Sequence, residues 1–442
     1  MMIFKSKHSN YIDNNKLNKY RNIFKTASLF VISLALTVTS LASFISIPAM
    51  AYPGELDTSF NFGGSGFDGA VRKVIVQNDE KIIATGGFSN YNSTPANRII
   101  RLSHEGGIDS SFVYGSGFNA TVNEATIQED GKIVCVGLFT EYNGISSVGI
   151  ARLNIDGSLD ESFSINSGVG FSGGSAVSVT FNNDKILVSG SFISYNGNVS
   201  RNLVRINIDG TYDSTLNIGT GFVGTVYDPT VLSDGKILIT GNFSALNGST
   251  VSTGILRLNN DGSVDSSFNT GTGFNPNARF IYVDDKVIYY TGSINSYDTT
   301  PANRIIRLNS DGTLDNTFVY GAGFDGSTQK LAIDPTSKIL VTGSFLNYDT
   351  TPANRIIRLN SDGTLDNTFV YGAGFNGNTQ YLTIDKSFVY ISGSFTSYNN
   401  QTAGRLARLY LTNDKDADGL DDNIEDSSPN SGDANQDGTL DS

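Results

Sequence analysis

The sequence contains no tryptophan, one cysteine and two histidines among its 442 residues. A single cysteine excludes an internal disulfide and a cysteine-based zinc site. Cys135 lies in an apolar run, and we interpret it as a small buried core residue rather than a nucleophile. His104 lies in a predicted hairpin turn, so a Ser-His-Asp site would depend on that turn residue alone.

Positive charge is also scarce. The chain has 30 Lys and Arg against 43 Asp and Glu, a formal net charge of −13, and no basic block. It therefore lacks the electrostatic pattern of a nucleic-acid binder. Hydrophobic residues make up 38% of the chain, which is compatible with a packed core. The 48 glycines, 20 tyrosines and 27 phenylalanines favour an all-β protein rich in turns.

The N-terminal segment differs from the rest of the chain. Residues 1–25 are basic, residues 26–54 carry no charge, and Leu29–Ile47 is strongly apolar. Ala49-Met50-Ala51 then provides the small residues that a signal peptidase requires. This pattern predicts a signal peptide over residues 1–51, and hence a secreted or cell-surface protein without a membrane span after cleavage. An uncleaved anchor is the alternative, because about 20 apolar residues can cross a bilayer.

The C-terminal segment, residues 412–442, is strongly acidic. Its stretch Asp414–Glu425 matches the calcium-loop pattern D-x-D-x-D-G-x5-E. Calcium binds about six to eight oxygen ligands. The predicted ligands are Asp414, Asp416, Asp418, the backbone carbonyl of Leu420, Asp422 and Glu425. A second copy supplies Asp433, Asn435, Asp437 and Asp441 and stops at Ser442, before its last ligand position.

The two acidic copies resemble the thrombospondin type 3 calcium repeat, since no strong flanking helices are evident. The resemblance covers residues 414–442 and implies Ca²⁺ as a cofactor of this tail. A disordered acidic tail is the alternative. The incomplete second copy leads us to expect that the sequence is a piece of a longer surface protein.

Between these ends, one motif is repeated seven times. Its final aromatic position, occupied once by leucine, falls at residues 60, 112, 163, 216, 268, 318 and 369. Each copy leads into a Gly-x-Gly-Phe corner, followed by an apolar run and an Arg-Leu or Arg-Ile segment. Tyr297–Phe324 and Tyr348–Phe375 are identical at all 28 positions, which indicates growth of the array by duplication.

Each repeat predicts four short strands, which in the second unit are 121–128, 132–136, 149–154 and 158–163. A period of about 50 residues with four strands is typical of a propeller blade. The array opens with an isolated fourth-strand segment, Leu56–Phe60, and closes with strands one to three. We therefore expect a monomeric, all-β, seven-bladed β-propeller over residues 52–411, with Leu56–Phe60 completing the last blade and leaving no open sheet edge.

An arginine and an aspartate lie eight residues apart in each intact hairpin between strands three and four. An x-Asp-Gly loop would place the two side chains opposite each other. The predicted pairs are Arg101 and Asp109, Arg152 and Asp160, Arg205 and Asp213, Arg257 and Asp265, Arg307 and Asp315, Arg358 and Asp366, and, across the closure, Arg408 and Asp57. Exposed pairs contribute about 0–1 kcal/mol, so we expect them to fix register more than stability. An anion-binding ring of arginines is the alternative.

The segments LDxSF, DGKI, GxFxxYNG and RLNxDG recur in one order. In these motifs the chain resembles the bacterial delta-60 repeat family over residues 52–411. This resemblance implies an exported or surface β-propeller and transfers no catalytic residues.

The GxFxxYNG segment places a tyrosine in the predicted loop between strands two and three. These residues are Tyr91, Tyr142, Tyr195, Tyr297, Tyr348 and Tyr398. Tyrosine beside asparagine suits sugar binding, while packing between blades is the structural alternative. Most acidic residues fall at repeated positions, and no break in the repeat symmetry indicates catalysis.

These observations favour an exported, non-enzymatic binding or adhesion protein for a glycan or a surface protein. One alternative is an extracellular polysaccharide hydrolase or lyase with carboxylates at the propeller mouth. A structural spacer without a ligand is the other.

Overall fold

The computed structural model describes residues 52–182, 184–276, 278–284, 287–319 and 321–412. The predicted signal peptide and the predicted calcium ligands from Asp414 to Asp441 lie outside these residues. Within the described ranges, no helix is both long and apolar enough to cross a membrane.

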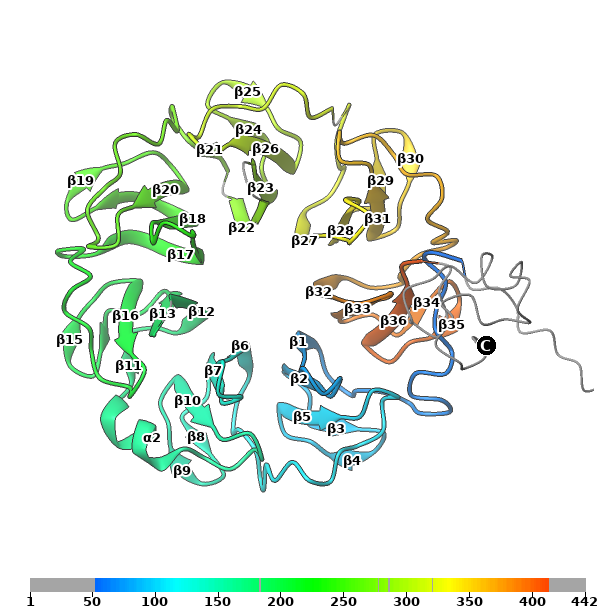
Figure 1. Cartoon of the computed structure of the whole chain (residues 1–442), viewed down its shortest axis with the longest axis horizontal. Coiled ribbons are helices and arrows are strands. Elements are labelled where there is room, and N and C mark those ends of the chain that lie inside the picture. The colour runs from blue at the N-terminus through cyan, green and yellow to red at the C-terminus, as the bar shows by residue number, and fades with distance from the viewer. Residues whose placement is uncertain (1–51, 183, 277, 285–286, 320, 413–442) are drawn as a thin grey trace, which may run out of the picture. The chain divides into compact units, whose positions relative to one another are not determined.

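Seven β-sheets surround a common centre, and each sheet presents its first strand to that centre (Figure 1). The fold is thus the all-β, seven-bladed propeller expected from the repeats. The first strands are β1 (Val71–Val76), β6 (Val122–Ile127), β12 (Ala176–Asn182), β17 (Phe222–Val231), β22 (Ala278–Asp284), β27 (Thr328–Ile333) and β32 (Thr379–Asp385).

The second strand is the middle strand of each blade and is almost entirely buried, as in Ile82–Gly86 and Ile339–Gly343. Neighbouring blades cover both of its faces, which explains why it reads as a continuous apolar run instead of alternating. The second strands are β2 (Ile82–Gly86), β7 (Ile133–Gly137), β13 (Lys185–Gly190), β18 (Ile237–Leu246), β23 (Val287–Gly292), β28 (Ile339–Gly343) and β33 (Phe388–Gly393).

The third strand pairs antiparallel with the second in every blade. The third strands are β5 (Ile99–Leu102), β10 (Ile150–Leu153), β16 (Leu203–Asn207), β20 (Ile255–Leu258), β26 (Ile305–Asn309), β31 (Ile356–Leu359) and β36 (Leu406–Tyr410).

The fourth strand is reduced to a single bridge, such as Leu153 with Leu159 and Leu359 with Leu365. The turn before the bridge depends on Gly157, whose φ of +88° suits glycine. After the bridge the chain turns away from the sheet, because an aspartate side chain accepts hydrogen bonds from the residue two positions later. Asp109 Oδ1 lies 3.0 Å from the Ser111 backbone nitrogen and 2.7 Å from its hydroxyl.

The second blade departs from the expected strand at 158–163. Residues Glu161–Ser167 form the helix α2, and Asp160 caps it by accepting a hydrogen bond from the Phe163 backbone nitrogen. The strand prediction beyond Asp160 is therefore wrong. The segment from Phe163 to Phe171 is longer than its counterpart from Phe112 to Phe118, which leaves room for the helical turns.

The N-terminal segment contacts the seventh blade. Leu56 forms a bridge with Leu409, and the Asp57 backbone nitrogen donates to the Arg408 carbonyl at 2.9 Å. The first and seventh blades also contact each other directly, since the Thr383 hydroxyl donates to the Val74 carbonyl at 2.7 Å. These bonds join residues from the two ends of the repeat array.

Short hairpins connect strands two and three and lie toward the outer edge of the ring (Figure 1). Their strands are β3 (Asn90–Tyr91), β4 (Thr94–Pro95), β8 (Glu141–Tyr142), β9 (Ile145–Ser146), β14 (Ser194–Tyr195), β15 (Asn198–Val199), β19 (Ser249–Thr250), β24 (Ser296–Tyr297), β25 (Thr300–Pro301), β29 (Asn347–Tyr348), β30 (Thr351–Pro352), β34 (Ser397–Tyr398) and β35 (Gln401–Thr402), with β11 (Phe171–Ser172) and β21 (Phe274–Asn275) added in two blades.

Candidate functional site in the central channel

The six tyrosines of the hairpins between strands two and three are buried, with at most 4% of each residue exposed. The Tyr348 hydroxyl donates to the Gly363 carbonyl at 2.6 Å, and its ring packs 4.7 Å from that of Phe324. Equivalent hydroxyl bonds are made by Tyr91, Tyr142, Tyr195, Tyr297 and Tyr398. The hypothesis that these rings bind a ligand is therefore corrected: they hold the hairpins together inside the blades.

The structure brings together all seven arginines with their predicted aspartates. The distance from Arg Nε to Asp Oδ2 is 2.7 Å for Arg101 and Asp109 and 2.6 Å for Arg408 and Asp57. The other five pairs have the same contact at 2.6–2.9 Å. The pairs are largely buried, contrary to the exposed pairs expected from the sequence. Removing one partner would thus leave a charge with little solvent, at a cost of about 3–5 kcal/mol.

Each of these arginines makes a second contact, with the next blade. Arg205 Nη1 donates to the Asn260 carbonyl at 2.7 Å, and Arg358 Nη1 donates to the Leu411 carbonyl at 2.8 Å. The guanidinium of Arg358 also lies 5.0 Å from the centroid of the Phe369 ring. Each guanidinium contacts an aspartate and a carbonyl, and six of the seven also lie beside an aromatic ring, while the repeat of Arg205 has Leu216 at that position. The arginines therefore join blades, and the geometry does not favour an anion-binding ring.

A β-bulge interrupts the first strand of every blade near its start. Such bulges often redirect side chains at functional sites. Here they bring side chains from different blades into contact at the centre of the ring. The residue pairs at the bulges are Arg72-Lys73, Asn123-Glu124, Val177-Ser178, Tyr227-Asp228, Arg279-Phe280, Gln329-Lys330 and Gln380-Tyr381.

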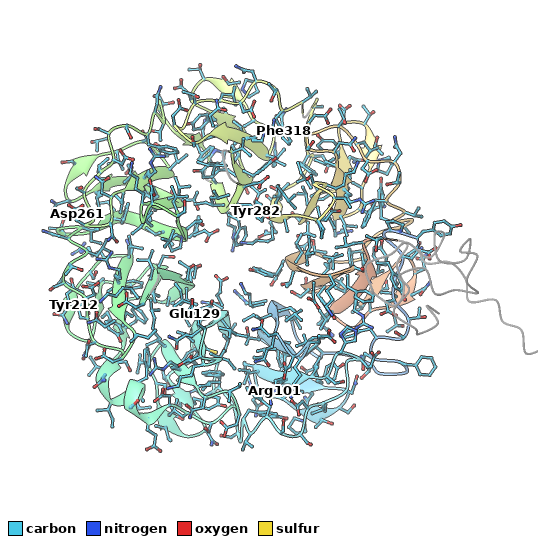
Figure 2. The ribbon with its side chains drawn as sticks, in the orientation of Figure 1. Arg101, Glu129, Tyr212, Asp261, Tyr282 and Phe318 are labelled. Carbon is cyan, nitrogen blue, oxygen red and sulfur yellow. The ribbon has the colours of Figure 1, made fainter. Side chains whose placement is uncertain are left out.

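In Figure 2, Tyr282 of the first strand β22 lies near the centre of the ring, whereas Tyr212 and Asp261 lie toward the outer edge. The central side chains differ in charge and size from blade to blade, unlike the Arg-Asp pairs. The centre of the ring, called the channel below, is therefore where sevenfold equivalence is lost.

Two ion pairs join side chains of different blades at the centre of the ring. Lys73 Nζ lies 2.9 Å from Glu124 Oε1 of the second blade and also donates to the Tyr381 hydroxyl of the seventh blade. Lys330 Nζ of the sixth blade lies 4.0 Å from Asp228 Oδ2 of the fourth blade. Lys330 thus reaches past the intervening fifth blade, and four charged groups from four different blades form one cluster.

The two carboxylates of the cluster have opposite pKa shifts. Burial, reinforced by the negative charge of Glu124, raises the pKa of Asp228 although Lys330 opposes the shift. Burial also opposes ionisation of Glu124, but the charges of Lys73 and Lys330 hold its pKa below the usual range. The site therefore holds one carboxyl that is protonated more readily and one that stays ionised.

Two arginines flank this cluster. Arg72 and Arg279 are exposed, and neither forms an ion pair with a carboxylate within the described ranges. Arg72 donates to Asn123 Oδ1 at 3.1 Å, and the Arg279 guanidinium lies 5.8 Å from the Tyr227 ring centroid. Arg72 is exposed but partly surrounded by neighbouring side chains, and this partial desolvation, with the positive charge of Arg279, lowers its pKa, so the two cations repel each other.

The sequence interpretation missed this cluster because it found no break in the repeat symmetry. The signal is in the sequence: the two residues at the bulge of the first strand change from Arg-Lys to Asn-Glu, Tyr-Asp and Arg-Phe. The repeat motifs consist of the positions that do not change from unit to unit, so they leave out these two variable residues.

Cys135 and His104 lie outside the channel cluster. Cys135 is fully buried in the middle strand of its blade, and this burial raises the pKa of its thiol. His104 lies in the hairpin after β5, with Glu80 and Glu105 each 3.9 Å from its ring nitrogens. Its backbone carbonyl accepts the hydrogen bond from Arg408 at 2.7 Å.

All seven repeats match the family described as a domain of unknown function (DUF5122) beta-propeller. The matched residues are 77–112, 128–163, 182–216, 232–268, 284–318, 335–369 and 389–410. The chain belongs to this family. The DUF5122 repeats cover strands two to four of the first six blades and strands two and three of the seventh, and they omit most of the bulged first strand, where the charged cluster lies.

Solved structures with similar architecture include the computationally designed Ika8 protein, at 10% identity and a TM-score of 0.48, covering 79% of this chain and 98% of that protein. The extracellular domain described as part of a one-component system from B. thetaiotaomicron has 12% identity and a TM-score of 0.46, covering 81% of this chain and 40% of that one. A streptogramin B lyase has 14% identity and a TM-score of 0.45, covering 81% and 98%. A search of curated proteins gives no match.

Proposed function

We propose that the protein is an exported binding protein whose channel mouth recognises an acidic glycan. The observation that carries this proposal is the pair of exposed arginines, Arg72 and Arg279, beside a cluster whose carboxylates are already bound to lysines. Arg72, Arg279, Lys73 and Lys330 outnumber Glu124 and Asp228, so the six groups carry a net positive charge when ionised. An anion entering the mouth would relieve the repulsion between the two guanidinium groups.

The chemistry of the mouth suits a carboxylated or sulfated sugar. A guanidinium group can donate two parallel hydrogen bonds to a carboxylate. Aromatic rings beside it, here Tyr227 and Phe280 at 5.8 and 5.9 Å from the Arg279 guanidinium, provide flat apolar surfaces for sugar rings. The buried hairpin tyrosines have no part in this binding.

The sequence outside the described residues supports the remaining parts of the proposal. The basic, apolar and small-residue pattern of residues 1–51 supports export to the cell surface or medium. The D-x-D-x-D-G-x5-E pattern from Asp414 to Glu425 supports a calcium-stabilised linker. Calorimetric titration of the full chain with Ca²⁺ tests the linker: we expect saturable binding that Glu425→Gln weakens strongly, and equal heats for both proteins would contradict it.

A panel of matched acidic and neutral oligosaccharides tests the binding function. We expect the full chain to bind acidic members and to lose affinity for their carboxyl-reduced counterparts, with weaker binding at high salt. Binding of neutral sugars alone would contradict an arginine-based site. Retention of an acidic protein but no sugar would place the recognition on a protein partner.

The opposite pKa shifts of Asp228 and Glu124 favour a second candidate function, cleavage of an extracellular polysaccharide. Two carboxyl groups with pKa values shifted in opposite directions are typical of an acid and a base in glycoside cleavage. In this scheme Asp228 is the acid and Glu124 the ionised partner. Product release from acidic polysaccharides, abolished by Asp228→Asn, would favour the enzyme, whereas bound but intact polysaccharide would favour the binding protein.

A further inference from the structure

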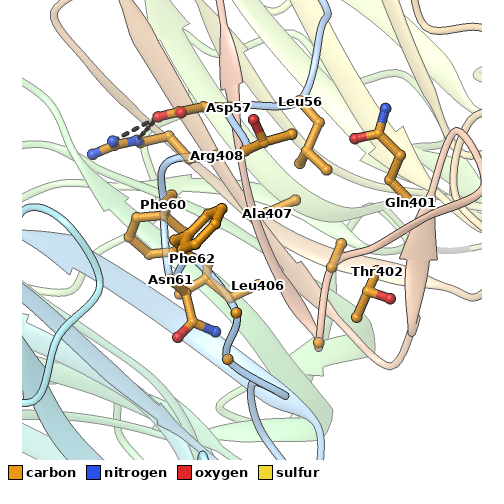
Figure 3. Close-up of a pocket in the computed structure, with 15 residues that line it drawn as sticks. Leu56, Asp57, Phe60, Asn61, Phe62, Gln401, Thr402, Leu406, Ala407 and Arg408 are labelled. Atoms are coloured by element: carbon orange, nitrogen blue, oxygen red, sulfur yellow. Dashed lines mark hydrogen bonds and ion pairs between the residues drawn. The ribbon is translucent and has the colours of Figure 1, made fainter.

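A pocket of about 380 Å³ lies where the N-terminal segment meets the seventh blade (Figure 3). Leu56 and Phe60 of the N-terminal segment line one side. Gln401, Thr402 and Ala403 line the other side. The Arg408-Asp57 ion pair also borders the pocket, but each charge there is already bound to the other.

In two other blades a tyrosine fills the equivalent place, whereas the second, third and fourth blades carry Ile165, Ile218 and Thr270 at that position. In the first blade the Tyr114 hydroxyl donates to the Pro95 carbonyl at 2.7 Å, and its ring lies 6.4 Å from that of Phe112. In the sixth blade Tyr371 makes the same bond to Pro352 at 2.6 Å and lies 6.5 Å from Phe369. In both blades, therefore, a tyrosine ring occupies one slot. The slot lies between the segment that follows the third strand and the short hairpin that connects strands two and three.

At the closure the slot lacks this side chain. The residue at the corresponding position is Phe62, but the segment from Phe60 to Phe67 is one residue longer than that from Phe112 to Phe118. The extra glycine, in Gly63-Gly64, lengthens the loop, and Phe62 borders the pocket with 88% of the residue exposed. The seventh blade thus has the walls of the slot but no tyrosine within it.

We propose that this pocket is a binding site for a phenol ring. Phe60 provides the aromatic wall that Phe112 provides in the first blade. The carbonyl of Thr402 takes the position of the Pro95 carbonyl at the end of the hairpin and accepts a hydrogen bond from the hydroxyl of the bound ring. The ring can belong to a free phenolic compound or to a tyrosine of a partner protein. This site is separate from the channel, so it does not depend on the proposed glycan binding.

Ligand-observed NMR titration of the full chain with p-cresol tests the site, with toluene as the analogue that lacks the hydroxyl. We expect p-cresol to bind and toluene to bind about three- to tenfold more weakly, because one hydrogen bond is lost. The matched control replaces residues 61–65 with Val-Tyr-Gly-Ser, the sequence of residues 113–116. This variant restores the first-blade loop, so we expect its own tyrosine to fill the slot and to abolish p-cresol binding without lowering the melting temperature.

The phenol site would be overturned by equal p-cresol affinity of the wild type and the loop variant, by equal affinity for toluene, or by no binding of p-cresol. A further arm uses N-acetyltyrosinamide. Its binding supports a partner tyrosine as the source of the ring, whereas binding of p-cresol alone supports a free phenol. If Phe62→Ala raises p-cresol affinity more than tenfold, Phe62 itself competes for the slot and the proposal of an open site is overturned.

Discussion

The guanidinium of Arg408 lies 2.6 Å from the carboxylate of Asp57, although 351 residues separate them in the sequence. Both side chains are only 2% exposed. The other six pairs are local, eight residues apart. The Arg408-Asp57 pair therefore makes the same contact but joins the N-terminal segment to the seventh blade.

Arg408→Ala is expected to destabilise the propeller by about 3–5 kcal/mol, because Asp57 is left buried without its partner. Arg307→Ala is the matched control, since it removes the equivalent pair within one hairpin. Both variants should melt earlier, but only Arg408→Ala should release residues 52–60 to limited proteolysis. An unchanged melting temperature, or identical cleavage of the two variants, would count against this role of the closing pair.

The propeller is expected to lose stability in acid between about pH 4 and pH 2. Burial opposes ionisation of Asp109, but hydrogen bonds from Ser111 and the charge of Arg101 lower its pKa to about 2, against about 3.9 in an unfolded chain. The unfolded state thus binds more protons, so stability is fully present above pH 4 and falls as the pH approaches 2. Urea unfolding across this range measures the effect, and Asp109→Asn should reduce its slope. A flat profile would contradict it.

Tyr348→Phe is expected to reduce stability by about 1–3 kcal/mol, because the buried Gly363 carbonyl loses its donor. Ligand binding should stay unchanged, since Tyr348 lies inside the blade. Thermal melting and a binding assay on the same protein check both parts. A variant with wild-type stability and altered binding would return the hairpin tyrosines to consideration as ligand contacts.

Two core positions of the fifth blade carry a large and a small side chain in the opposite order from the sixth blade. Ile294 replaces the phenylalanine found as Phe345 in the sixth blade, and Tyr290 replaces the aliphatic Val341. The Tyr290 ring lies 5.1 Å from Phe274, whereas in the sixth blade Phe345 makes the corresponding contact with Phe324 at 4.5 Å.

Tyr290→Val should therefore leave a cavity and cost about 2–5 kcal/mol. Adding Ile294→Phe should recover much of this loss, because it restores the packing of the sixth blade. A double-mutant cycle from urea unfolding measures the coupling. Strictly additive effects would show that the two positions do not share one space.

The sequence was sufficient for the blade count and the Arg-Asp register, because both follow from spacings that recur in every unit. It could not decide whether Tyr348 was exposed, since the same loop sequence suits a surface or a packed hairpin until the neighbouring strands are placed. The sequence also could not predict the contact between Lys330 and Asp228. These residues lie two blades apart and meet only because the ring and the bulges bring them together.

Affinity for an acidic oligosaccharide, measured on three arginine variants of the full chain, tests the central claim most directly. Arg72→Gln and Arg279→Gln each remove one cation from the channel mouth, while Arg201→Gln removes an exposed arginine next to β16, away from the channel cluster. We predict that the two mouth variants lose at least about tenfold in affinity and that Arg201→Gln binds like the wild type. Equal affinity of all three variants, or no acidic ligand bound by the wild type, would contradict the account.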